Sequence, residues 1–73
     1  MAKSLRFRVE TTDENVIVTL AGTGCMVNYG KAAYGLAVLH MTGDADAPIH
    51  EFHFHARAWQ LANEKAKALG WIV

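Results

Sequence analysis

The segment from Ile49 to Leu69 (IHEFHFHARAWQLANEKAKAL) constrains the fold most, because its hydrophobic period changes midway. From 49 to 56, apolar and polar residues alternate, and Phe52 and Phe54 fall on the same side. From 58 to 69, apolar residues recur at intervals of three and four. A change from period 2 to period 3.6 is typical of a strand that runs into a helix. Gly70 follows as a helix C-cap should.

The same segment also fits a second interpretation, one long helix from about Ala47 to Leu69. Phe52 and Trp59 follow helical spacing, and Pro48 suits the first turn of a helix. We favour the strand for 47–56, because Phe52 and Phe54 cannot share one helical face while the alternation around them is strict.

Two segments near the N-terminus predict a β-hairpin. Residues 5–10 alternate cleanly, residues 16–21 are rich in β-branched side chains, and residues 11–15 between them favour a turn. The cross-strand pairs expected on the core side are Val9 with Val18 and Phe7 with Leu20. Both apolar sets then face the same side, which supports this register.

The middle of the chain is less regular. Residues 22–35 hold four of the six glycines and predict a long loop, of which Cys25–Tyr29 could extend a strand. Residues 33–42 are apolar on both faces, as in a central strand, and residues 43–48 indicate a turn. The whole chain, 1–73, therefore predicts a single α+β domain. We expect an antiparallel β-sheet of about four strands in the order β-β-β-β-α, with one C-terminal helix packed on one face and the other face open.

Composition excludes several classes of function. The formal net charge is zero, which excludes a strongly basic nucleic-acid binder as a description of the whole chain. Cys25 is the single cysteine, so no intrachain disulfide can form. We find neither an apolar leader segment nor a run of the roughly 18 apolar residues that crosses a bilayer. We therefore expect a soluble, cytoplasmic protein without a membrane partner.

The open face of the expected sheet is the first candidate site. Arginine and lysine can bind phosphates, while tyrosine and histidine can stack on bases. We therefore expect nucleic acid, DNA or RNA, to bind this face and the adjoining glycine-rich loop. The candidate contact residues are Arg6, Arg8, Tyr29, Lys31, Tyr34, His53 and His55.

Two other functions compete with nucleic-acid binding. A small sheet gains stability by pairing, so the chain could be a homodimerising protein-interaction module. Third, His40, Glu51, His53 and His55 would lie on one face in one strand register and could bind a metal, although a His-x-His spacing alone is a weak signal. We expect no enzyme activity and no cofactor, because Cys25 has no adjacent base and Gly22-Thr23-Gly24 lacks the features of a phosphate loop.

A sheet followed by a helix with regularly spaced alanines and a terminal Ala-Leu-Gly resembles the second half of double-stranded-RNA-binding domains. It also resembles the small sheet-plus-helix DNA-binding domains of recombinases. The resemblance lies in the order of the elements. Arg57 is the one cation at the start of the helix, where the first family carries a basic cluster, so no residue role follows from the resemblance.

Overall fold

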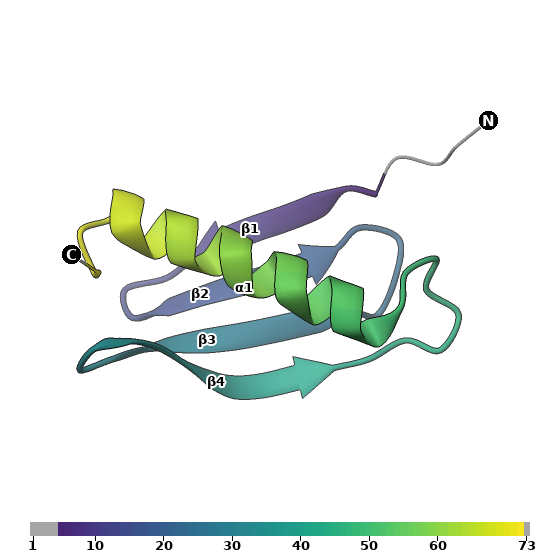
Figure 1. Cartoon of the computed structure of the whole chain (residues 1–73), viewed down its shortest axis with the longest axis horizontal. Helices are drawn as coiled ribbons and strands as arrows, with labels where there is room; N and C mark the ends of the chain where they lie inside the picture. Colours follow the sequence, from purple (N-terminus) through teal and green to yellow (C-terminus); the bar gives the residue numbers. More distant parts are fainter. Residues whose placement is uncertain (1–4, 73) are drawn as a thin grey trace.

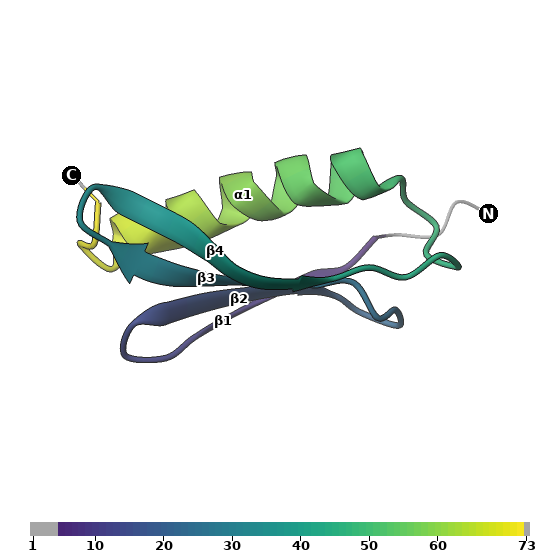
Figure 2. The same ribbon diagram turned by 90° about the horizontal axis from the view of Figure 1, so that it is seen from below.

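The computed structural model describes residues 5–72 and contains one antiparallel sheet and one helix. The elements in chain order are β1 (Phe7–Thr11), β2 (Asn15–Leu20), β3 (Met26–Ala32), β4 (Gly35–Thr42) and α1 (Glu51–Ala68). The four strands lie side by side in chain order, and α1 crosses one face of the sheet (Figure 1). The other face is left uncovered (Figure 2). The predicted α+β class and the order β-β-β-β-α are confirmed.

The β1–β2 hairpin has the predicted register. Val9 lies opposite Val18, and Phe7 lies opposite Leu20. The inward side chains of β2 (Val16, Val18 and Leu20) are buried under α1, while Ile17 and Thr19 alternate with them on the open face. The alternation of residue types was sufficient here because it pairs two neighbouring segments across a short turn.

The predicted long loop at 22–35 is wrong for half of its residues, because Met26–Ala32 form β3, and the strand considered for Cys25–Tyr29 lies largely within it. Val27 and Tyr29 are buried on the helix side of the sheet, and Asn28 between them faces the other way. This alternation is a strand pattern that the high glycine content obscured. Gly30 lies within β3, where Leu39 packs against it so closely that a Cβ atom on Gly30 would stand 2.7 Å from Leu39 Cδ1. The glycine therefore accommodates a neighbouring side chain rather than a loop.

The strand predicted for 49–56 is also wrong, and the alternative of a helix is confirmed from Glu51 onward, whereas residues 47–50, which it also included, precede the helix. Helix α1 begins at Glu51. His50 caps it, because His50 Nδ1 accepts a hydrogen bond from the backbone N–H of Phe52 at 3.1 Å. Phe54 is buried with 2% of its surface exposed, whereas 77% of Phe52 is exposed. The two phenylalanines therefore lie on different sides of a helix and do not share a strand face.

A glycine ends the helix as predicted. Gly70 has φ of +79°, a backbone conformation that glycine adopts most readily. Its N–H donates to the carbonyl of Lys67 at 3.0 Å, and the N–H of Trp71 donates to the carbonyl of Ala66 at 2.8 Å. These two bonds form a Schellman motif, which satisfies carbonyls at the end of the helix.

The core lies between α1 and the first three strands. Ala58, Ala62 and Ala66 are completely buried, and their small side chains let the helix backbone approach the sheet. Phe54 adds the one large buried side chain of the helix and stacks on Phe7 with 5.8 Å between ring centroids. Trp59, which follows the helical spacing of the apolar residues, is 46% exposed.

Strand β4 lies at the edge of the sheet, not at its centre as its apolar sequence had indicated. Helix α1 packs mainly over β2, so β4 remains at the margin of the covered area (Figure 1). A bulge interrupts the β3–β4 ladder, because Asn28 pairs with His40 whereas Tyr29 pairs with Val38. Leu39 is the extra residue of the bulge.

Candidate interaction surfaces

Two of the residues predicted to bind nucleic acid, Arg6 and Arg8, lie on the open face of the sheet. Arg6 and Arg8 flank Phe7, whose side chain packs toward the core, so both arginines project from the uncovered face. Arg8 lies opposite Thr19 on β2. Two neutral polar groups from neighbouring strands share this face, since Asn15 Nδ2 donates to Asn28 Oδ1 at 2.9 Å.

Three other predicted contact residues lie elsewhere. Tyr29 is a core residue, only 2% exposed, and its ring contacts that of Trp59 at 5.5 Å between centroids. Lys31 lies on the helix side of the sheet, with Nζ 5.4 Å from the centre of the Trp71 ring. Tyr34 is fully exposed in the turn between β3 and β4. The burial of Tyr29 also raises the pKa of its hydroxyl.

The structure separates His53 and His55 from the open face and leaves His40 on it. His53 and His55 belong to α1, which covers the opposite face, and His40 belongs to β4. The face that was expected to gather them with Glu51 does not exist, because 49–56 is helical. Within residues 5–72, no group of three or more histidine, cysteine, aspartate or glutamate side chains lies close enough to hold a metal ion.

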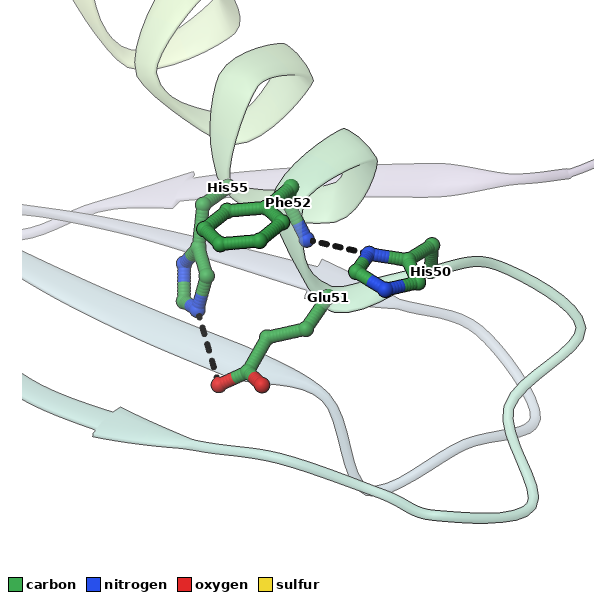
Figure 3. A network of polar contacts seen from close by, with 4 residues as sticks. All are labelled: His50, Glu51, Phe52 and His55. Carbon is green, nitrogen blue, oxygen red and sulfur yellow. Dashed lines mark hydrogen bonds and ion pairs between the residues drawn. The ribbon is translucent and has the colours of Figure 1, made fainter.

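A hollow lies at the N-terminal end of α1, and Figure 3 shows the polar contacts of His50, Glu51 and His55 at this end of the helix. Its volume is about 410 Å³, and Glu51, His55 and the buried Cys25 help to line it. Glu51 Oε1 lies 3.7 Å from His55 Nε2, one helical turn away. Phe52 stacks on the capping His50, with 5.3 Å between the ring centroids.

The side chain of Asp44 forms hydrogen bonds to two loop segments beside this hollow. Its carboxylate accepts hydrogen bonds from the backbone N–H of Gly24 at 2.7 Å and from that of Asp46 at 2.9 Å. These two bonds, to Gly24 first, hold the pKa of the carboxyl below its usual value. Asp44 therefore connects the β2–β3 turn to the segment that leads into α1.

The outer edge of β4 is the surface that the sequence interpretation missed. This strand spans eight residues, GLAVLHMT, and contains no Asp, Glu, Lys, Arg or Pro. Val38, Leu39 and Met41 are 48%, 60% and 49% exposed. Proteins normally protect an edge strand with charges, proline or a covering segment. The absence of charge in 33–42 was visible in the sequence, but it indicated a central strand.

The other edge of the sheet, β1, differs from β4 in its length and in its charged side chains. It has five residues, FRVET, and carries the exposed charged side chains of Arg8 and Glu10. Charges on a short edge strand discourage pairing with another chain. Only one of the two edges is therefore suited to receive another strand.

The flank of α1 beside β4 continues the apolar surface. Phe52 and Trp59 are seven residues apart, two helical turns, and both are partly or largely exposed. Beside Trp59, a hollow of about 490 Å³ is lined by Tyr34, Leu36 and Ile72 among others. We name the outer edge of β4, with Leu36, Val38 and Met41 on its helix side, the β4 surface.

Comparison of the chain with protein-family models, with curated proteins and with solved structures finds no match. Among residues 5–72, α1 carries too many polar and charged side chains to span a bilayer.

Proposed function

We propose that this protein is a homodimerising protein-interaction module that associates through the β4 surface. One observation carries the proposal: β4 is a long, uncharged edge strand with three half-exposed, large apolar side chains. Its outer backbone N–H and C=O groups lack a strand partner within residues 5–72. An added strand would satisfy these groups and remove apolar surface from water.

A second copy of the chain is the partner that fits best. The same edge strand on both copies can pair with itself in antiparallel orientation, which closes the assembly at two subunits. The formal net charge of zero means that two copies do not repel each other strongly. A domain of 73 residues also buries a smaller share of its surface on folding than a larger domain does, so it gains from a partner.

Val38→Lys tests the proposal. Val38 is 48% exposed, so dimer formation could bury about half of its surface, which corresponds to about 1 kcal/mol for each copy. Two copies lose about 2 kcal/mol together, which raises the dimer dissociation constant by roughly 30-fold. Glu10→Lys is the matched control, because it also places a lysine on an edge strand, but on β1.

Sedimentation equilibrium over a range of protein concentrations measures the association. We expect a dimer for the parent protein and for Glu10→Lys, and a shift toward monomer for Val38→Lys. A parent protein that stays monomeric up to about 1 mM would refute the proposal, since its association free energy is then weaker than about 4 kcal/mol. Equal weakening by both lysine substitutions would show that added charge, not the β4 surface, is responsible.

Nucleic-acid binding on the open sheet face is the second candidate function. It is supported by Arg6 and Arg8, which lie on the face of the sheet opposite α1. Asn28 and His40 lie opposite each other farther along the same face and can form hydrogen bonds to bases or sugars. This face also carries Glu10, so the number of phosphate contacts is small and we expect weak binding.

Fluorescence anisotropy with labelled single-stranded and double-stranded DNA and RNA tests this candidate. Arg8→Gln should weaken binding and reduce the salt dependence, because one phosphate contact is lost. Arg57→Gln is the control, since Arg57 is exposed on α1 and hydrogen-bonds to Gln60 at 2.9 Å. Absence of binding at low salt, or equal effects of the two substitutions, would exclude this face as the binding site.

A further inference from the structure

We infer that two copies pair β4 against β4 about a two-fold axis between Leu39 and His40. Val38 of each copy then lies opposite Met41 of the other, and Leu39 lies opposite His40. This inference rests on the proposed dimer and adds its register. It follows from the face of the sheet to which each β4 side chain points.

The ladder between β3 and β4 fixes the side chains that point toward α1. Val38 lies opposite Tyr29, and Met41 lies opposite Val27. Tyr29 and Val27 are buried beneath the helix. Directly opposed residues of an antiparallel pair project from the same face, so Val38 and Met41 both belong to the helix side.

The other β4 side chains point to the open face. Ala37 lies opposite Gly30, and His40 lies opposite Asn28, two positions that alternate along β3 with the helix-facing Val27 and Tyr29. Leu39 is the bulge residue, and its side chain occupies the space beside Gly30 where a Cβ atom would stand. Leu39 and His40 therefore project from the same face although they are neighbours in sequence, as in a β-bulge.

Among axes that lie from Val38 to His40, this interruption selects one register for self-pairing. With the axis between Leu39 and His40, each opposed pair has both side chains on one face; the pairs are Ala37 with Thr42, Val38 with Met41 and Leu39 with His40. An axis between Val38 and Leu39 would set these two residues opposite each other, although they face opposite sides. An axis through Leu39 would oppose Val38 to His40, with the same conflict.

The register also places the two bulges against each other. In each copy the strand changes its alternation at Leu39 and His40, and in the dimer these residues meet the same residues of the other copy. The bulge of one β4 strand therefore lies opposite the bulge of the other. The result is a continuous antiparallel sheet with both helices on one face and both pairs of Arg6 and Arg8 on the other.

Disulfide cross-linking of cysteine variants tests the register. In the double variant Val38→Cys/Met41→Cys, opposed Cα atoms would lie about 4.5–5.5 Å apart across the dimer, within the range that a disulfide bridges. The matched controls are the two single variants. In each of them the introduced cysteine would lie about 10 Å along the strand from its own copy, which is too far. The buried Cys25 is common to all three variants.

The variants are incubated with oxidised glutathione and separated under denaturing conditions without reductant. We expect a covalent dimer from the double variant, reversed by a thiol reductant, and little from either single variant. An isotope-filtered NOE between Val38 and Met41 methyl groups of differently labelled copies checks the unmodified protein. Failure of both signals in a protein that sediments as a dimer would overturn the register alone. A monomeric parent protein would overturn the dimer as well.

Discussion

The choice between a strand and a helix at 49–56 can be tested with two phenylalanines. In a strand, Phe52 and Phe54 would face the same side and contribute similarly to stability. In the structure, Phe54 is 2% exposed and stacks on Phe7, whereas Phe52 is 77% exposed and contacts the capping His50. The comparison of Phe54→Ala with Phe52→Ala therefore tests how the helix is oriented on the sheet.

The expected magnitudes differ widely. Phe54→Ala removes a buried ring and leaves a cavity, which costs about 3–5 kcal/mol. Phe52→Ala removes a ring that is mostly in water, so it costs no more than about 0.5 kcal/mol. A chain of 73 residues has a free energy of unfolding of roughly 4–11 kcal/mol, so Phe54→Ala removes a large part of it.

Urea unfolding followed by far-UV circular dichroism measures both changes. With a slope of about 1 kcal/mol per molar urea, typical of a small domain, Phe54→Ala should lower the midpoint by roughly 3 M and Phe52→Ala by less than about 0.5 M. Phe54→Leu provides a milder truncation if Phe54→Ala does not fold. Measurements at two protein concentrations separate folding from self-association. Equal losses for the two alanine variants would refute the helical placement.

Three further substitutions probe the core and the loops. Asp44→Asn should lower the unfolding free energy at neutral pH, and the difference between variant and parent should become smaller in acid; urea midpoints at pH 7 and near pH 2–3 check this. The Asp44 carboxylate stabilises the fold at pH values above its ordinary pKa, because its pKa is lowered in the folded state, and this contribution disappears as the pH falls through the folded-state pKa. Tyr29→Phe should reduce the loss of stability at high pH, and urea titrations at alkaline pH measure this loss. Burial raises the pKa of the Tyr29 hydroxyl above 10.0, so as the pH rises the hydroxyl ionises in the unfolded chain before it ionises in the folded protein. Ala62→Leu should cost about 1–3 kcal/mol by overpacking a completely buried position, whereas Ala56→Leu on the exposed side should change the unfolding free energy by less than about 0.5 kcal/mol.

The β1–β2 hairpin could be predicted because its information is local. Both strands alternate, both apolar sets must face one core, and a short turn allows one register that satisfies them. The helix end was predictable for the same reason, since Gly70 alone supplies the backbone conformation that ends the helix. The placement of Arg6 and Arg8 on the open face followed directly from this alternation.

The predicted site residues Tyr29, His53 and His55 were placed wrongly because the spacing of nearby residues did not determine their secondary structure. Tyr29 was assigned to a glycine-rich loop, but a strand with Gly30 under Leu39 carries it into the core. His53 and His55 were assigned to a strand face, but they lie on a helix. In 22–35 the glycine content outweighed the alternation of a strand, and in 49–56 the alternation outweighed the spacing of a helix.

The sequence by itself determined the class of fold, the first hairpin and the end of the helix, because each depends on residues close together in the chain. The tertiary structure alone decided which phenylalanine of α1 is buried, because the sheet offers one covered face and a helix presents neighbouring side chains in different directions. It also decided that β4 is an edge strand. An uncharged apolar run is equally suited to the centre of a sheet and to an edge that pairs with another chain. The two cases are distinguished only by the strand order, in which β4 pairs with β3 on one side.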